Sequence, residues 1–237
     1  MEIDKIYNED CLEGMRAIPD GIVDMILCDL PYGTTACKWD TIIPFEPLWE
    51  QYLRVLKENG AIVLFGSEPF TSKLISSQID IYRYSWIWDK GNAGNYATSH
   101  YQPLKITEDI IVFYRKQCTY NPQGLKPYGK IQHRGSTAKH FGENKQLELQ
   151  NFQEYTNYPK NIISFSKRET DKALHPTQKP TSLLTYLIKT YTNEGELVLD
   201  NCMGVGSTAI ACLHSKRHFI GYELERDYST LSLAHTL

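Results

Sequence analysis

Apolar residues occur along this chain in short runs that alternate with longer amphipathic segments. Short runs rich in Val and Ile and bounded by turn residues are typical of buried strands. Such runs predict strands at residues 3–7, 22–27, 61–65, 82–88, 108–114, 196–200 and 218–222. Helical spacing predicts helices at residues 44–57, 68–77, 181–192 and 209–214, and a short one after residue 10. This alternation indicates an α/β fold with a largely parallel sheet and crossover helices.

The pattern breaks down between about residue 116 and residue 171. Gly, Pro, Asn, Gln, His and Lys dominate there, and neither a strand nor a helix period persists. A stretch of this length without strong elements is unusual inside a compact domain and is often functional or disordered. Aromatic residues alternate with Lys and Arg in it, which suits phosphate contact and base stacking.

Basic residues gather in the same part of the sequence. The 237-residue chain has a net charge of -3, yet residues 115–179 hold 12 Lys and Arg against 5 Asp and Glu. The rest of the chain is therefore strongly acidic. This asymmetry indicates either a basic face for a polyanion or a solvated, Lys-rich loop region.

Composition narrows the class of protein. With 41% hydrophobic residues the chain can build one sizeable core, and it has no apolar run of the roughly 18 residues that a membrane span needs. The first residues lack the shape of a signal peptide. None of the six cysteines forms a C-x-x-C pair, so we expect reduced thiols in a cytoplasmic protein, without a metal site or a disulfide framework.

Candidate chemistry appears directly after the predicted strand at residues 22–27. Asp29, Pro31 and Tyr32 bring a carboxylate, a rigid backbone and an aromatic ring to the end of this strand. In open α/β sheets, ligands bind at the carboxyl edge of the strands. Taken singly, the aspartate could be a turn former and the tyrosine a core residue.

A second candidate site follows the strand at residues 196–200, which ends on Asp200. Gly204 and Gly206 come next and lead into a helix, so the backbone can turn tightly and approach a ligand closely. Glu223 follows the next strand, where an acidic residue can bind ribose hydroxyls. This turn alone does not distinguish a nicotinamide dinucleotide from S-adenosylmethionine, so an NAD-dependent dehydrogenase is one interpretation.

Four motifs taken together resemble a known family. They are Asp29-Leu30-Pro31-Tyr32-Gly33, the run from His175 to Pro180, Asp200 with the glycine turn, and Gly221-Tyr222-Glu223. In this order they resemble the β-group of DNA amino-methyltransferases, whose signature is Asp-Pro-Pro-Tyr. The resemblance implies a Rossmann-like methyltransferase sheet flanked by helices, with the catalytic half (1–115) before a target-recognition insert (116–172) and a cofactor-binding half (173–237).

The resemblance also implies S-adenosylmethionine as the cofactor. The residues that it assigns to the cofactor are Asp10, Asp29, His175, Thr177, Gln178, Lys179, Asp200, Gly204, Gly206 and Glu223. Glu223 would hold the ribose, Asp10 would meet the adenine, and the run from His175 to Lys179 would face the methionine end. A helix N-cap at Asp10 and ordinary helix-entry chemistry at His175 and Lys179 remain open.

The catalytic residues that the resemblance implies are Asp29, Leu30, Pro31 and Tyr32. The lone pair of an exocyclic amine is delocalised into its ring, so the amine attacks a methyl group poorly. The Asp29 carboxylate and the Leu30 carbonyl would accept its two N–H groups and raise the electron density on nitrogen. Tyr32 would stack on a base that has left the duplex. Leu30 stands where the family usually has Pro, so the backbone is less rigid there.

The resemblance implies a DNA methyltransferase that acts on the N6 amine of adenine in double-stranded DNA. Asp29, rather than Ser, favours adenine, and cytosine N4 is the alternative within the class. A non-catalytic DNA-binding subunit that retains the fold is a further alternative. We expect no membrane partner, and the resemblance is compatible with a homodimer.

Overall fold

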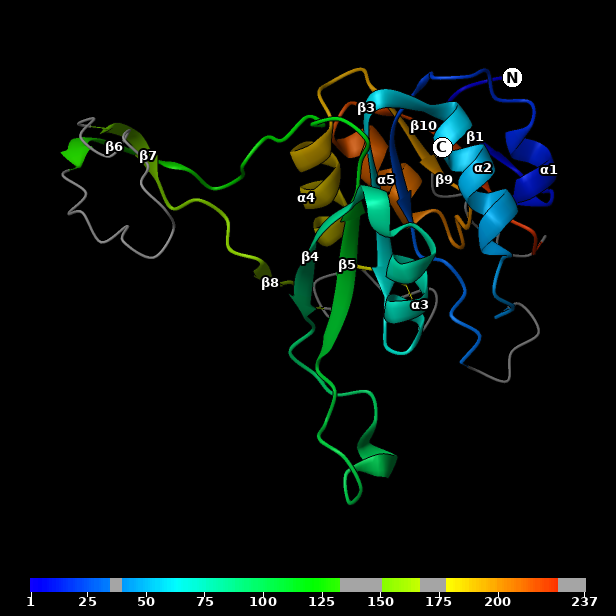
Figure 1. Cartoon of the computed structure of the whole chain (residues 1–237), viewed down its shortest axis with the longest axis horizontal. Coiled ribbons are helices and arrows are strands. Elements are labelled where there is room, and N and C mark those ends of the chain that lie inside the picture. Colours follow the sequence, from blue (N-terminus) through cyan, green and yellow to red (C-terminus); the bar gives the residue numbers. More distant parts are fainter. Residues whose placement is uncertain (35–39, 133–150, 167–177, 226–237) are drawn as a thin grey trace. The chain divides into compact units, whose positions relative to one another are not determined.

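The computed structural model describes residues 1–34, 40–132, 151–166 and 178–225 (Figure 1). Contacts divide the chain into two units, Met1–Asn121 with Asn161–Leu237, and Pro122–Lys160. The strands are β1 (Lys5–Tyr7), β2 (Val23–Cys28), β3 (Leu56–Gly66), β4 (Tyr82–Asp89), β5 (Thr107–Phe113), β6 (Lys126–Gln132), β7 (Asn151–Thr156), β8 (Ile162–Ser164), β9 (Leu197–Asp200) and β10 (His218–Tyr222). The helices are α1 (Cys11–Met15), α2 (Phe45–Val55), α3 (Phe70–Ser77), α4 (Thr181–Tyr191) and α5 (Ser207–His214), with 3₁₀ turns η1 (Ile79–Ile81) and η2 (Tyr96–Thr98).

The first unit is built on an eight-stranded sheet in the order β1-β10-β9-β2-β3-β5-β4-β8. Neighbours from β1 to β3 pair in parallel. The late strand β9 lies against the early strand β2, with Met25 opposite Val198 and Ile26 opposite Leu199. The predicted α/β fold with a mostly parallel sheet is therefore confirmed, and the two predicted sites meet because β2 and β9 are neighbours.

The direction of the strands changes at β5, which is antiparallel to both β3 and β4. The sequence pattern predicts crossover helices, but the connection from β4 to β5 is the loop at residues 90–106, with only the short η2 turn inside it. A connection without a crossover helix suits an antiparallel pair. The sheet is thus largely parallel, as predicted, with β5 as its antiparallel strand.

Helices cover both faces of the sheet, and each face has its own apolar core. Along β2, Met25 and Leu27 pack with α4 and α5, whereas Ile26 and Cys28 pack with α1, α2 and α3. This alternation follows from the period of two in a strand. Since helices cover both faces, the central strands appear in the sequence as continuous apolar runs.

Helix α2 begins and ends close to the predicted residues. Leu48, Tyr52 and Val55 are buried on one face, which is the helical spacing of the sequence. The helix ends at Val55, because Leu56 has an extended backbone and pairs with Val23 of β2. Residues 56 and 57 thus belong to β3, although the pattern placed them in the helix.

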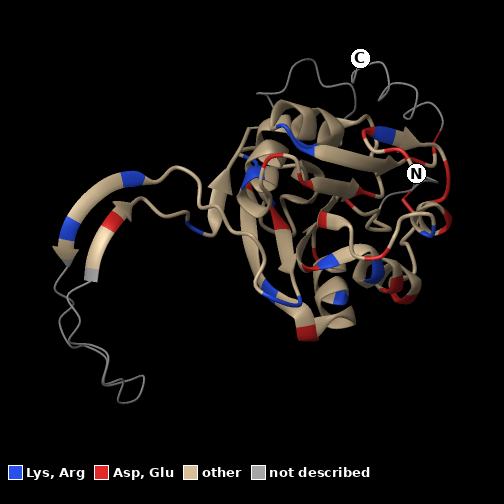
Figure 2. Ribbon diagram, turned by 90° about the horizontal axis from the view of Figure 1, so that it is seen from above, with Lys and Arg blue, Asp and Glu red and all other residues tan. Residues whose placement is uncertain are grey.

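The second unit contains the antiparallel pair β6 and β7. Sequence analysis found no strong element between residues 116 and 171, whereas β6, β7 and β8 lie there. A register shift between Pro127 and Lys130 interrupts the alternation that would have revealed β6. The described part of the second unit contains the basic residues Lys126, Lys130 and Lys160 and the acidic residue Glu154 (Figure 2). Much of the predicted basic excess lies outside the described residues.

Among the described residues, every helix is too short or too polar to span a lipid bilayer.

Candidate active site

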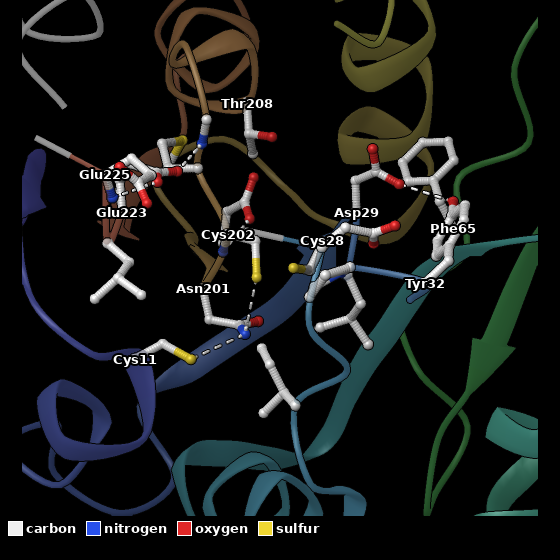
Figure 3. Close-up of a pocket in the computed structure, with 18 of the residues that line it drawn as sticks. Cys11, Cys28, Asp29, Tyr32, Phe65, Asn201, Cys202, Thr208, Glu223 and Glu225 are labelled. Carbon is white, nitrogen blue, oxygen red and sulfur yellow. Dashed lines mark hydrogen bonds between the residues drawn. The ribbon is translucent and has the colours of Figure 1, made fainter. Parts of the chain in front are cut away.

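A cavity of about 570 Å³ opens at the carboxyl ends of the parallel strands (Figure 3). Its size lies in the range of small-molecule and cofactor sites. It is lined at one end by Asp29 and Tyr32 after β2, and at the other by Asp200 and Gly204 after β9. One continuous space thus joins the two candidate sites that the sequence placed 171 residues apart.

Asp29 has two hydrogen-bond donors in this cavity. The Tyr32 hydroxyl donates to Oδ1 at 2.8 Å, and Lys179 Nζ donates to Oδ2 at 2.5 Å. The Asp29 side chain remains 31% exposed. Since a carboxylate can accept about four hydrogen bonds, Asp29 keeps acceptor capacity toward the cavity.

Tyr32 is held in place by its ring as well as its hydroxyl. The ring stacks on Phe70 of α3, with centroids 5.0 Å apart and planes at 29°. Burial, together with the negative charges of Asp29 and Glu108, raises the pKa of the Tyr32 hydroxyl well above its usual value. Tyr32 is therefore a neutral hydrogen-bond donor to Asp29.

Lys179 connects Asp29 to a second carboxylate. Its ammonium group lies 2.5 Å from Asp29 Oδ2 and 3.3 Å from Glu108 Oε2, and Lys90 Nζ lies 3.0 Å from Glu108 Oε1. Burial opposes the charge of Lys179, but the two carboxylates outweigh it and raise the pKa above its usual value. The result is a chain of alternating charges, Asp29–Lys179–Glu108–Lys90.

Leu30 and Pro31 continue from Asp29 along the cavity wall. The Leu30 side chain is only 4% exposed and belongs to the apolar core that includes α2 and α3. Burial of a leucine stabilises a fold by about 1.5–3 kcal/mol. Packing of Leu30 therefore anchors the backbone at the point where the related signature has a proline.

The glycine turn lies between β9 and α5. Gly204 has φ +55° and Gly206 has φ +88°, a left-handed conformation in which other residues are strained. The Gly204 N–H donates to Glu223 Oε2 at 2.7 Å, and the Glu225 N–H donates to Glu223 Oε1 at 2.9 Å. The predicted turn is thus present, and Glu223, which follows β10, accepts a hydrogen bond from it.

Asp200 ends β9 and is almost fully buried beside the turn. Its Oδ1 accepts a hydrogen bond from the Cys202 N–H at 3.0 Å. Burial raises the pKa of the Asp200 carboxyl to about 6, although hydrogen bonds from Thr208 and Cys202 oppose this shift. Burial likewise raises the pKa of Glu223. Both carboxylates are poorly solvated, so donors of a bound ligand would stabilise them.

Asp10 is the N-cap of α1. Its Oδ1 accepts hydrogen bonds from the N–H groups of Leu12 at 2.9 Å and Glu13 at 3.2 Å. The N-cap interpretation is therefore confirmed. Asp10 also lines the cavity, so contact with a ligand remains a separate prediction.

The structure brings most of the predicted site residues to one cavity. The predicted residues that line the cavity are Asp10, Asp29, Leu30, Pro31, Tyr32, Gln178, Lys179, Asp200, Gly204 and Glu223. Gly206 shapes the turn at the N-terminus of α5 but is not among the lining residues. His175 and Thr177 lie outside the described residues.

Sequence reasoning missed several residues of the cavity. Glu108 is the second residue of β5, and Phe65 is the last but one residue of β3, which is a weak signal in each case. Cys11, Cys28 and Cys202 also line it, and the five described cysteines are unpaired with one another. Cys37 lies outside the described residues.

The side chain of Asn201 contacts several residues around the cavity. It accepts a hydrogen bond from the buried hydroxyl of Tyr52, and its Nδ2 lies 3.5 Å from Cys11 Sγ and 3.6 Å from Cys202 Sγ. Among the described residues, the buried Ser207 Oγ beside the turn has no hydrogen-bond partner. A buried hydroxyl without a partner is expected where a ligand supplies one.

Comparisons with known proteins agree with this geometry. The profile of a family of DNA methylases, which covers N6 and N4 methylation, matches residues 23–234. Type II methyltransferase M.HpaI of Haemophilus parainfluenzae is 27% identical over 241 residues, covering 94% of this chain and 71% of the relative. DNA adenine methyltransferase YhdJ of Escherichia coli (strain K12) is 27% identical over 255 residues, covering 98% and 82%.

Solved structures share the fold. M1.HpyAVI, crystallised as a complex with SAM, has a TM-score of 0.65 at 23% identity and covers 98% of each chain. The cytosine-N4-specific PvuII DNA methyltransferase has a TM-score of 0.70 at 14% identity, covering 98% of this chain and 86% of that one. Because the family profile extends from the start of β2 to beyond β10, this chain belongs to the N6/N4 family of DNA amino-methyltransferases.

Proposed function

We propose that this chain transfers a methyl group from S-adenosylmethionine to the N6 amine of adenine in double-stranded DNA. The observation that carries the proposal is the shared cavity, in which the Asp29 carboxylate and the glycine turn at Gly204 face the same space. A methyl donor at the turn and an extruded base at Asp29 could therefore meet without further rearrangement of the sheet.

The residues around the turn fit S-adenosylmethionine. Glu223 and Asp200 offer carboxylate oxygens for hydroxyl and amine donors, and Ser207 offers a buried hydroxyl that lacks a partner among the described residues. When bound, the sulfonium of this cofactor supplies an electrophilic methyl group, so the chemistry needs no metal. Asp10 and Gln178 extend the same lining.

Asp29 would act on the amine of the base. Its free acceptor capacity, with the Leu30 carbonyl, suits the two N–H groups of an exocyclic amine and would increase the electron density on nitrogen. Lys179 and Tyr32 hold the carboxylate in place, as the 2.5 Å and 2.8 Å hydrogen bonds indicate. The role of Tyr32 in stacking on the base requires the ring face that Phe70 does not cover.

The geometry of Lys179 changes one expectation. The resemblance assigns Lys179 to the methionine end of the cofactor, but its ammonium group contacts Asp29 and Glu108. We therefore infer that Lys179 orients Asp29, and that other donors near the turn would meet the carboxylate of the cofactor.

Adenine is the proposed target because Asp29 leads the motif and because YhdJ carries the name of an adenine methyltransferase. Cytosine N4 is the second candidate, because the fold also matches the cytosine-N4-specific PvuII enzyme. The dehydrogenase interpretation of the glycine turn is set aside, because the family profile is that of DNA methylases.

The direct test is mass spectrometry of nucleosides from duplex DNA treated with the purified protein and S-adenosylmethionine. We expect N6-methyladenine, whereas N4-methylcytosine would select the second candidate.

Asp29→Ala should abolish methyl transfer and leave the affinity for S-adenosylmethionine within about twofold of the wild type, because the glycine turn is untouched. The matched control is Asp20→Ala, at an exposed side chain before β2, which should behave like the wild type. If the wild-type protein binds S-adenosylmethionine but leaves the DNA unmodified, this result would favour a non-catalytic DNA-binding subunit.

A further inference from the structure

The connection between β4 and β5, residues 90–106, displays two almost fully exposed tyrosines. We call this segment the β4–β5 loop; it extends beyond the sheet at the bottom of Figure 1. Tyr96 is 79% exposed and Tyr101 is 88% exposed, and Leu104 and Ile106 are also exposed. Clustered exposed aromatic and aliphatic side chains are typical of an interaction surface.

Hydrogen bonds within the loop hold its shape. Asn95 Nδ2 donates to the Pro103 carbonyl at 3.1 Å, and the Lys105 N–H donates to Asn95 Oδ1 at 2.7 Å. Gln102 Nε2 donates to Thr98 Oγ1 at 2.9 Å. The tyrosines are therefore presented on a preformed turn, which reduces the conformational entropy lost when a partner binds.

The loop begins at the edge of the sheet where the cavity opens. Since β5 is antiparallel to both β3 and β4, β4 runs in the same direction as β3 and β2. The carboxyl end of β4 thus lies at the same edge as Asp29, which follows β2. The base of the loop is joined to that edge, because Lys105 Nζ donates to Ser67 Oγ, just after β3, at 2.5 Å.

An ion-pair chain also leads from the loop to Asp29. Lys90, the first residue of the loop, pairs with Glu108, and Glu108 shares Lys179 with Asp29. One carboxylate, that of Glu108, and one ammonium group, that of Lys179, therefore lie between the loop and Asp29, the proposed acceptor of the amine.

The charge of the loop favours a polyanion. Residues 90–106 contain two lysines and a histidine, and no aspartate or glutamate, although the chain as a whole is acidic. Glu108 balances the charge of Lys90, so the net positive charge of the loop comes from Lys105. Positive charge beside exposed aromatic rings suits phosphate contact together with base stacking. A protein surface that buried these tyrosines would not require the absence of acidic residues.

We propose that the β4–β5 loop is a DNA-binding element that contacts the duplex beside the extruded base, with Tyr96 and Tyr101 stacking on the bases left exposed by extrusion. This inference rests on the proposed function and adds a contact outside the cavity and outside the segment 116–172. An aromatic ring that replaces lost base stacking stabilises the extruded state, so the loop promotes base extrusion and does not take part in methyl transfer.

The test compares Tyr96→Ala/Tyr101→Ala with the wild type on two duplexes that carry a sequence methylated by the wild type. In one duplex the target base is paired, and in the other it lies opposite an abasic site and is easily extruded. We expect kcat/KM to fall about tenfold or more on the paired duplex, and much less on the abasic one. The Tyr96→Phe/Tyr101→Phe variant should retain wild-type activity, because it keeps both rings.

Two controls separate this role from a general defect. Ile79→Ala removes an exposed side chain of η1, which precedes β4 and so lies at the opposite edge of the sheet; it should have no effect. S-adenosylmethionine affinity, measured by calorimetry, should be within twofold of the wild type for every variant.

Equal activity of the double alanine variant and the wild type on the paired duplex would overturn the inference and leave the proposed function intact. An equal loss on both duplexes would also overturn it, because the loop would then act after extrusion. A wild type that binds the donor but methylates no DNA would instead overturn the proposed function, and this inference with it.

Discussion

At the scale of single residues, the site depends on how a buried lysine is shared. Lys179 lies between the carboxylates of Asp29 and Glu108, and Lys90 balances Glu108 from the other side. An acceptor carboxylate works best when it keeps electron density for the incoming N–H group, and a neighbouring cation reduces that density. Glu108 offsets part of the positive charge that Asp29 would otherwise meet.

Glu108→Gln should therefore lower kcat by about tenfold, because Lys179, which contacts Asp29, then lacks its second carboxylate. The KM for S-adenosylmethionine should change little, since Glu108 does not touch the glycine turn. Steady-state kinetics with tritiated donor measures both constants. The matched control is Glu58→Gln, at an exposed ion pair with Lys116. An unchanged kcat for Glu108→Gln would remove Glu108 from the proposed positioning chain.

Asp200 predicts how donor binding depends on pH. Burial raises the pKa of its carboxyl to about 6 in the folded protein, above the usual 3.8, so folding favours the protonated form. The ionised form that accepts donors of the cofactor is lost as the pH falls through about 6. Donor affinity, measured by calorimetry, should then decrease up to tenfold per pH unit below about 6. Asp200→Asn should weaken binding at pH 7.5 and flatten this dependence, and a wild-type affinity that is constant from pH 7.5 to pH 5 would contradict the role.

At the scale of elements, the turn between β9 and α5 depends on backbone conformation rather than on space. A Cβ at Gly204 would meet no atom within 4 Å, yet φ is +55°. An alanine in this left-handed region is strained by about 1–2 kcal/mol. The glycine is thus required by the turn itself, which also positions the Gly204 N–H toward Glu223.

Gly204→Ala should lower the free energy of unfolding by about 1–2 kcal/mol, as measured by urea denaturation. Gly204→Asn should be less destabilising, because asparagine tolerates this conformation better. Gly94→Ala is the control, since a Cβ there also meets open space and its φ is not positive. If the alanine variants at 204 and 94 are equally stable, the strain argument is wrong.

At the scale of the whole molecule, the chain separates into the unit that holds the cavity and the unit Pro122–Lys160. All residues that line the cavity belong to the first unit. The second unit contains only the β6–β7 pair among its described residues, and such a two-stranded sheet is marginally stable by itself. We propose that it reads the DNA target, a role that its exposed aromatics and lysines suit.

Replacing residues 122–160 with a flexible linker of about ten Gly and Ser residues should leave S-adenosylmethionine affinity within twofold of the wild type. Affinity for duplex DNA, measured by fluorescence anisotropy at fixed salt, should fall at least tenfold, and sequence preference should disappear. Unchanged preference for the methylated sequence would assign target recognition to the first unit. Thermal unfolding checks that the shortened chain is folded.

The sequence by itself determined the parts that depend on local chemistry. The alternation of apolar runs and amphipathic segments predicted the α/β class, because strand and helix periods are local properties. Asp29 and Tyr32 were recognisable because they follow a buried strand, and Gly204 because a tight turn before a helix needs a positive φ. The motifs also predicted the family that the profile later confirmed.

Only the tertiary structure decided what depends on contacts between distant residues. It placed β9 beside β2 and so joined Asp29 to the glycine turn, and it brought Glu108 to Lys179 across 71 residues of chain. It also made β5 antiparallel to its neighbours and left the β4–β5 loop exposed at the edge of the sheet where the cavity opens. Strand order and ion pairs of this kind arise from packing of the whole core, which no local pattern encodes.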